Sequence, residues 1–420
     1  MNRWLLAVLF ASAIGCAGLR AQATLQPGAE PCDQAFSHAS AAVLGSQQRL
    51  LQQRVKDMDA GVAPALQALI GGFKDSLVGA TDAILHCQAA NTPAEQLQTN
   101  IARLLHANQP QPILSDDRYG ADLKVAVSTP VAAPQLRIVE IRFNIECGDD
   151  AVLLVYEPNK KNAELISSVG AHVDSGMPDG FERALRWQAA PYDQILGAFG
   201  DFFQYVLMPG LNGRQWRLAV AHGMPWCTST MSGFYVDLIE PRAGVPHVVW
   251  HDKQTYKRGD TDPRFILRPD GFELRADVFT IEIEHITRKG IFRYSVDGDT
   301  VRRVQPVATD GRGFVDQWLQ SPWSEAKEWS LPEGLAGFQK AHEAFELGRK
   351  DANTTYSYGP VRACLMKGQY EVEIDADPGG RQFYAIREAE NGYMLVNFGT
   401  TQDERCSGPD LMKRQPSQSH

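Results

Sequence analysis

The stretch AHGMPWCTSTMSG, in the middle of the chain, gathers side chains that could do covalent chemistry. His222 could serve as a general base, and Cys227, Ser229 and Ser232 are potential nucleophiles close to it in sequence. Further upstream, Asp174 could orient the histidine, as the acid of a nucleophile–base–acid triad does. If these side chains act together, the pattern predicts a secreted hydrolase.

The surroundings of these residues favour a structural role instead. A nucleophilic serine usually stands in a G-x-S-x-G elbow between a strand and a helix, whereas TSTMSG leads into a strand and predicts a polar loop. Cys227 lacks the flanking signatures of a nucleophilic cysteine, and export would oxidise its thiol to a disulfide. His222 continues the apolar face of the strand WRLAVAH, so we expect it to be buried.

Metal-binding patterns are weaker still. His172 and Asp174 alternate and could share an ion, but no second histidine pair with metal spacing and no CxxC motif accompanies them. Asp297 and Asp299 flank a glycine as in calcium loops, but the other ligand positions of an EF-hand are missing, and the pattern predicts a hairpin turn. We therefore expect neither a metal nor a cofactor.

Three tryptophans stand close together in a helical region: Trp318, Trp323 and Trp329. Aromatic platforms can bind sugars, but tryptophans that seal a helix against a sheet are commoner. Pro322 interrupts any single helix through all three, and we expect them to serve packing.

The N-terminus predicts export to the periplasm or the extracellular space. An arginine precedes an apolar run, and AQA ending at Ala23 is a typical cleavage site, so residues 1–23 are expected to be a signal peptide. The alternative is a lipoprotein box that ends at Cys16 and would anchor the chain through a lipid. The run is shorter than the ~20 residues that span a bilayer, and no other stretch is apolar enough, so we expect no transmembrane span in the mature chain.

Charge limits the partners. The 420 residues carry a formal net charge of −9, and the signal peptide contributes two arginines and no acid, so the mature chain is more acidic still. No block of basic residues interrupts this, which disfavours nucleic acid and anionic membrane surfaces. An envelope or extracellular ligand remains open, and its identity is not predicted.

Six cysteines remain after the signal peptide, and an even number in an exported chain favours disulfides. They fall in three pairs, one in each region of the chain. This order predicts the bridges Cys32–Cys87, Cys147–Cys227 and Cys364–Cys406.

The pattern of apolar residues predicts an α+β fold in three regions. Residues 24–112 show three- and four-residue spacing and predict a helical hairpin region, in which Cys32 would lie beside Cys87. Residues 113–350 predict a central antiparallel β-rich domain, with helices near 191–208 and 314–348. Three similar strand–turn–strand segments leave a propeller-like β-domain as the alternative.

Residues 351–420 predict a small β-meander with a polar tail, because DPGG and AENG are good hairpin turns between short strands. No catalytic pattern outweighs its structural explanation. We therefore expect an exported, disulfide-containing protein that binds a ligand or a partner in the cell envelope, with the hydrolase as the alternative.

Overall fold

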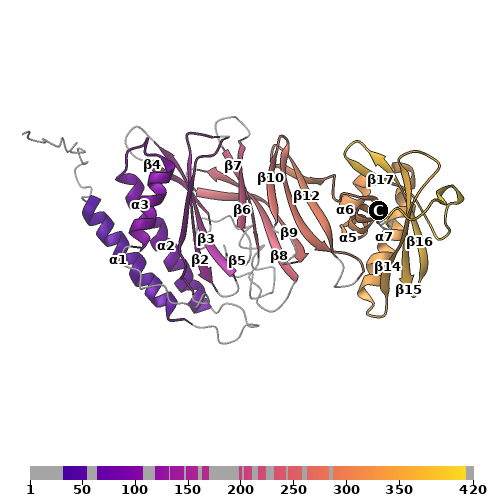
Figure 1. Ribbon diagram of the computed structural model, residues 1–420, viewed down its shortest axis with the longest axis horizontal. Coiled ribbons are helices and arrows are strands. Elements are labelled where there is room, and N and C mark those ends of the chain that lie inside the picture. Colours follow the sequence, from indigo (N-terminus) through magenta and orange to yellow (C-terminus); the bar gives the residue numbers. More distant parts are fainter. Residues whose placement is uncertain are drawn as a thin grey trace, which may run out of the picture.

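The computed structural model shows an α+β protein built as a row of layers (Figure 1). Along the long axis, three helices are followed by three antiparallel sheets and then by a C-terminal unit of helices and a fourth sheet. The structure describes residues 32–53, 64–106, 119–131, 133–145, 148–158, 163–169, 198–200, 203–210, 216–223, 231–242, 245–257, 263–282 and 287–412. The sheets follow one another in a row and not around a channel, so the propeller alternative does not describe them.

The first layer consists of α1 (Cys32–Leu51), α2 (Pro64–His86) and α3 (Ala94–His106). The Cys32–Cys87 disulfide joins the start of α1 to the end of α2, which is the pairing that the helical hairpin predicts. In α3, Leu97, Ile101 and Leu105 are buried at helical spacing and pack toward the first sheet. The helices therefore cover one face of that sheet.

Sheet A is the second layer. Its strands are β1 (Lys124–Ser128), β2 (Arg137–Ile145), β3 (Gly148–Pro158), β4 (Ala163–Val169) and β5 (Ala198–Gly200). Every side chain from Ala151 to Tyr156 is buried, because alternate residues of β3 pack on the helices and on the next sheet. A strand that is buried on both faces of its sheet has a continuous run of apolar residues in its sequence, as LLVY in β3 shows.

Lys74 of α2 and Asp150 of β3 form an ion pair inside the helix–sheet core. Lys74 Nζ lies 2.7 Å from Asp150 Oδ2, and the two side chains are 1% and 0% exposed. Burial raises the pKa of Asp150 and the charge of Lys74 partly opposes this, so the pKa is about 7. The pair is a polar link between the first two layers.

Sheets B and C are four-stranded meanders stacked face to face. Sheet B consists of β6 (Phe203–Pro209), β7 (Trp216–Gly223), β8 (Met231–Arg242) and β9 (Val245–Lys257). Sheet C consists of β10 (Arg264–Arg268), β11 (Gly271–Phe279), β12 (Thr287–Asp297) and β13 (Thr300–Val304). Sheet B packs on sheet A through one face and on sheet C through the other.

The helix predicted near 191–208 is wrong for the part that the structure describes. Residues 198–200 and 203–209 form β5 and β6, and β6 pairs with β7 over its whole length. Phe203 and Leu207 pack toward sheet A, whereas Met208 packs toward sheet C. The aromatic-rich pattern fits both periods over so short a run, and pairing with β7 selects the strand.

The C-terminal unit packs helices on one face of sheet D. The helical segments are α5 (Gly311–Gln320), α6 (Trp323–Ala326), η3 (Lys327–Trp329), η4 (Pro332–Gly334) and α7 (Leu335–Lys350). Sheet D is the meander β14 (Thr355–Ala363), β15 (Gln369–Asp377), β16 (Gly380–Ala389) and β17 (Gly392–Gly399). Trp318 is fully buried against Tyr384, and its Nε1 donates to Ala326 O at 3.0 Å, which is the packing role predicted for it.

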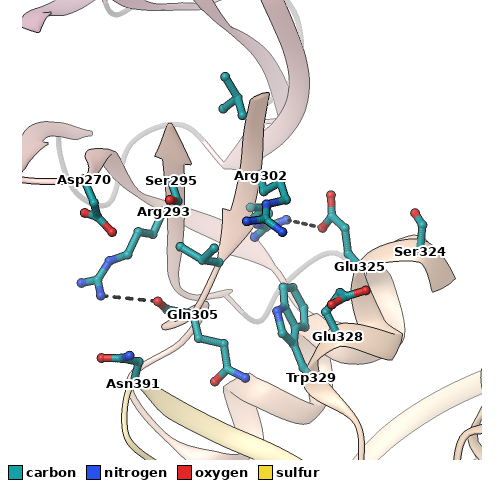
Figure 2. Close-up of a pocket in the computed structure, with 13 residues that line it drawn as sticks. Asp270, Arg293, Ser295, Arg302, Gln305, Ser324, Glu325, Glu328, Trp329 and Asn391 are labelled. Carbon is teal, nitrogen blue, oxygen red and sulfur yellow. Dashed lines mark hydrogen bonds and ion pairs between the residues drawn. The ribbon is translucent and has the colours of Figure 1, made fainter. Parts of the chain in front are cut away.

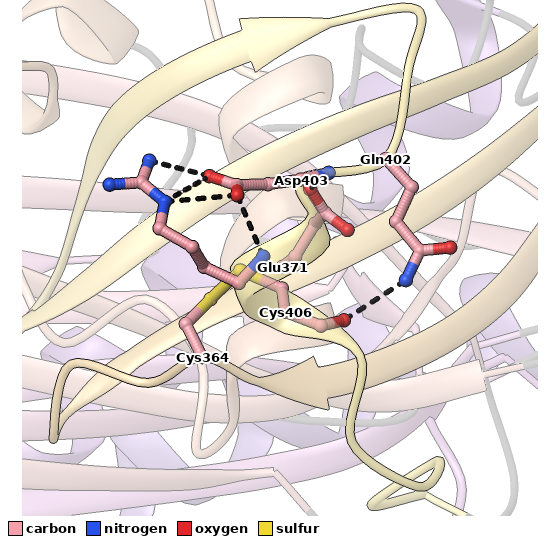
Figure 3. The surroundings of a disulfide bond; sticks show 6 residues. Cys364, Glu371, Gln402, Asp403 and Cys406 are labelled. Carbon is pink, nitrogen blue, oxygen red and sulfur yellow. Dashed lines mark hydrogen bonds and ion pairs between the residues drawn. A yellow bond between two sulfur atoms is a disulfide. The ribbon is translucent and has the colours of Figure 1, made fainter.

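The Cys364–Cys406 disulfide fastens the short helix η5 (Glu404–Cys406) beside sheet D, as the sequence predicts (Figure 3). The backbone N–H of Asp403 donates to Glu371 Oε2 at 2.9 Å, so η5 is also held by a side chain of β15. The bridge and this bond together hold η5 on the meander.

Polar side chains join sheet C to the C-terminal unit. Arg288 of β12 donates from Nε to Asp316 Oδ2 at 2.5 Å and from Nη2 to Gln317 Oε1 at 2.8 Å. Gln305, which follows β13, donates to the carbonyl of Tyr393 in β17. These contacts hold sheet C against α5 and β17 of the C-terminal unit.

Candidate functional site

A polar cavity of about 710 Å³ lies where sheet C meets the C-terminal unit. Figure 2 shows Asp270, Arg293 and Ser295 on one side and Glu325, Glu328 and Trp329 on the other. The first group belongs to sheet C and its turns, and the second belongs to α6 and η3. The volume is typical of small-molecule sites, which span about 300–1,000 Å³.

Arg303 of β13 is the most buried charged group in this lining. Its side chain is 3% exposed, and its guanidinium lies over the ring of Phe292, 4.5 Å from the ring centroid. Nε and Nη2 are buried and have no hydrogen-bond partner in the part of the chain that the structure describes. Unsatisfied buried donors are unfavourable, so an acceptor that reached this guanidinium would bind well.

Glu325 is the acidic neighbour of Arg303. The two side chains approach to 3.8 Å between Nη1 and Oε2, which is an ion pair but too long for a hydrogen bond. Burial raises the pKa of the Glu325 carboxyl, and the charge of Arg303 only partly opposes this. Arg303 and Glu325 are therefore paired loosely.

Arg293 is held in place by a buried carboxylate. Glu273 of β11 is fully buried on the side chain and accepts hydrogen bonds from Arg268, Arg275 and Arg293. Burial alone would raise the pKa of Glu273, but the three guanidinium groups outweigh it and hold the pKa at about 2. One carboxylate among three cations leaves a local surplus of positive charge beside the cavity.

The acidic groups at the cavity lie nearer to the solvent than Arg303. Asp270 and Glu328 are exposed, and the Glu325 side chain is 31% exposed. Arg302 is also exposed. Charges act more strongly where water is excluded, and the Arg303 side chain and the Glu325 Oε2 atom are the buried charged groups of this lining.

The edge of sheet C also contributes to the cavity. β13 is an edge strand of the sheet, and four of its residues, Val301 to Val304, line the cavity. A tight turn at Gly298, whose φ is +60°, leads into β13 and is the hairpin turn predicted around Asp297 and Asp299. An edge strand presents backbone donors and acceptors that no neighbouring strand uses.

His222, the strongest catalytic candidate of the sequence, is buried at the end of β7, away from this cavity. Its Nε2 lies 3.1 Å from Oδ2 of Asp237 in β8, and the same carboxylate accepts from Nδ1 of His251 in β9. The ring of Tyr235 lies between the two imidazoles, with centroids 5.3 Å and 5.0 Å away. The partner of His222 is thus Asp237, which the sequence analysis did not single out.

The Asp237 carboxylate is the negative charge at the centre of this cluster, and two histidines hold it in place. Burial would raise the pKa of Asp237, but hydrogen bonds from both histidines outweigh it and bring the pKa to about 2. Burial also lowers the pKa of His251, and Asp237 outweighs this and raises it above 6.5. A carboxylate only accepts, so each imidazole donates to Asp237.

Most partners proposed for His222 lie outside the described residues. These are Asp174, Cys227 and Ser229, together with the Cys147 half of the predicted Cys147–Cys227 bridge. Ser232 lies in β8 opposite Tyr256. No group of three metal-binding side chains occurs among the residues that the structure describes.

One sequence signal for the cavity was overlooked. The segment TVRRV places two adjacent arginines in a strand, so one of them must share the inward face with Val301. That residue is Arg303, which lies over Phe292 in the core between sheets B and C. An arginine at an inward strand position is a signal of a buried polar site.

Comparisons with protein-family models, with curated proteins and with solved structures give no match for this chain. Within the described residues, no helix is both long and apolar enough to cross a membrane.

Proposed function

We propose that the chain is an exported, non-catalytic protein that binds a small polar ligand in the cavity between sheet C and the C-terminal unit. The observation that carries the proposal is the cavity itself: about 710 Å³, lined mainly by polar side chains, with the buried Arg303 among them. Small-molecule sites combine such a concave shape with a few convergent polar groups, and they occur preferentially between structural units.

Export is supported by the disulfides as well as by the N-terminal sequence. The bridges Cys32–Cys87 and Cys364–Cys406 fasten the first and last layers of the described structure. Disulfides form and persist in oxidising compartments such as the periplasm and the cell exterior. A binding protein of the cell envelope fits this compartment.

A hydrolase is the second candidate, and the contact between His222 and Asp237 favours it. A carboxylate that accepts from one imidazole nitrogen orients a catalytic histidine for work at the other. Here the same carboxylate also anchors His251. Sharing of this kind favours a fixed polar link within sheet B over a general base.

Ligand binding and catalysis are separated by one set of measurements. Thermal unfolding is followed with D-glucose, L-lysine, D-glucuronate and D-glucose 6-phosphate, and turnover is assayed on ester, peptide and glycoside substrates. We expect at least one probe to raise the unfolding temperature, and no substrate to be turned over by the wild type or by His222→Ala.

The cavity is tested by filling it. Ser295→Trp places a bulky ring on the cavity wall, whereas Ser357→Trp places one at an exposed position of β14. The probe-induced shift should vanish in Ser295→Trp and persist in Ser357→Trp. Turnover that is lost in His222→Ala would instead support the hydrolase.

A further inference from the structure

Arg303 is an anomaly in an otherwise well-paired set of charges. The neighbouring Arg293 and Arg217 both bind carboxylates and backbone carbonyls. Arg303 makes no hydrogen bond to any described residue, although its side chain is only 3% exposed. A buried guanidinium is ordinarily paired and hydrogen-bonded, because water no longer satisfies its donors.

The position of Arg303 ties this anomaly to the cavity. Arg303 is one of the lining residues, and the ring of Phe292 supports its guanidinium from the core side. Glu325 stands opposite at 3.8 Å, and its Oε2 is also buried without a hydrogen-bond partner in the described structure. Two adjacent polar groups are thus unsatisfied at the same place.

We propose that the ligand of this cavity carries an anionic group, a carboxylate or a phosphate, that accepts hydrogen bonds from the Arg303 guanidinium. The inference rests on the proposed function and adds the chemical class of the ligand. The planar fork of an arginine matches the oxygens of both groups, and a stack on an aromatic ring holds the fork in place.

The remainder of the lining indicates what the rest of the ligand offers. Asp270, Glu328 and Asn391 are hydrogen-bonding groups at the exposed side of the cavity, and Ser295 lies on its wall. Carboxylates and amides of this kind bind hydroxyl or amino groups. The cavity therefore suits a molecule with an anionic head near Arg303 and a hydroxylated or amino-bearing body toward the solvent.

Glu325 competes with such a ligand for Arg303. An incoming anion must either displace the carboxylate or meet it in its protonated form, in which it donates a hydrogen bond. Removal of the negative charge by Glu325→Gln should therefore strengthen anion binding. Removal of the cation by Arg303→Met should weaken it, so the two variants act in opposite directions.

The test compares an uncharged sugar with related sugars and small ions that carry an anionic group. D-glucose, D-glucuronate and D-glucose 6-phosphate share one ring, and acetate and inorganic phosphate present the anion alone. Calorimetric titration and thermal unfolding are carried out on the wild type, Arg303→Met, Glu325→Gln and Arg387→Gln. Arg387 is an exposed arginine of sheet D, away from the cavity lining, and serves as the matched control.

We expect each anionic probe that binds the wild type to bind the control variant with the same affinity. Arg303→Met should weaken binding about tenfold or more, which corresponds to the loss of a charge-assisted hydrogen bond. Glu325→Gln should tighten it roughly two- to five-fold. Binding by glucuronate but not by glucose 6-phosphate identifies a carboxylate ligand, and the reverse identifies a phosphate ligand.

The stability of the ligand-free variant separates a ligand-binding role from a structural one. Because Arg303 has unsatisfied donors, Arg303→Met should not lower the unfolding temperature of the free protein. A lowered unfolding temperature together with unchanged anion binding overturns the inference. If glucose binds as well as the anions, the proposed function stands and the inference fails; if no probe binds, both fail.

Discussion

Replacement of Lys74 by methionine should destabilise the protein by about 3–5 kcal/mol, because it leaves Asp150 buried without its cation. The side chains of Lys74 and Asp150 are 1% and 0% exposed, and their charged atoms lie 2.7 Å apart. The variant keeps the length and apolar volume of the lysine stem. It therefore tests the charge and not the packing.

The chain contains a matched pair that differs only in burial. Lys124 Nζ lies 2.6 Å from Asp122 Oδ2, but these side chains are 61% and 51% exposed. An exposed pair contributes at most about 1 kcal/mol, since water screens it. Lys124→Met should therefore have a small effect, although it breaks a pair of the same chemistry and length.

The cost of Lys74→Met should also depend on pH. Burial already brings the pKa of Asp150 to about 7 with Lys74 present, and it should rise further without the lysine. A carboxyl whose pKa is raised by folding stabilises the native state below its unfolded pKa and loses that contribution as pH rises through the folded value. The variant should thus be least stable at alkaline pH.

Urea unfolding followed by far-UV circular dichroism measures these effects. The double variant Lys74→Met/Asp150→Asn should recover about 1–3 kcal/mol of the loss, because it removes the unpaired charge. Equal, small costs for Lys74→Met and Lys124→Met would refute the argument from burial. So would a double variant that is no more stable than Lys74→Met.

Three further predictions concern the other polar contacts. Asp237→Asn should lower the pKa of His251, because it removes the carboxylate that raises this pKa in the wild type. An NMR titration of the imidazole signals measures both values, and the wild-type pKa should lie above 6.5. A wild-type value below 6.5 would contradict the assigned contact. Replacement of Cys364 and Cys406 by serine opens a bridge between residues 42 apart and should lower the free energy of unfolding in urea by about 2–4 kcal/mol. A much smaller decrease would contradict a stabilising role for the bridge. Glu273→Gln should lower the stability by about 2 kcal/mol near neutral pH. Because the pKa of Glu273 in the folded protein is about 2, this difference in stability from the wild type should vanish as pH falls from 4.5 toward 2. A difference that stays constant with pH would contradict the three-arginine cluster.

Sequence reasoning predicted the fold class from strong local patterns. The alternation in RIVEIRFNI and the stripe of Leu97, Ile101 and Leu105 each allowed one reading only, and the structure has β2 and α3 there. Two disulfides followed from the same patterns, because an antiparallel helical hairpin and a closed meander bring their ends together. The helix, strand and turn patterns behind these predictions involve residues close in sequence.

The features that were missed depend on contacts between distant segments. The aromatic residues near 203–209 fit a helix as well as a strand, and only pairing with β7 decides between them. His222 meets Asp237 because β7 and β8 pair in one register, which sequence alone does not specify. The cavity requires sheet C and the segment 323–329 to face each other, so no local pattern could predict it.

The most direct test of the binding cavity is the NMR signal of the Arg303 Nε–Hε group. It is assigned by its loss in Arg303→Met and followed while D-glucuronate, D-glucose 6-phosphate or inorganic phosphate is added. If the cavity binds an anionic ligand, the Arg303 signal shifts on titration, while that of the exposed Arg387 does not. If the signal of Arg303 is unchanged by every probe, the proposed anion site in this cavity is contradicted.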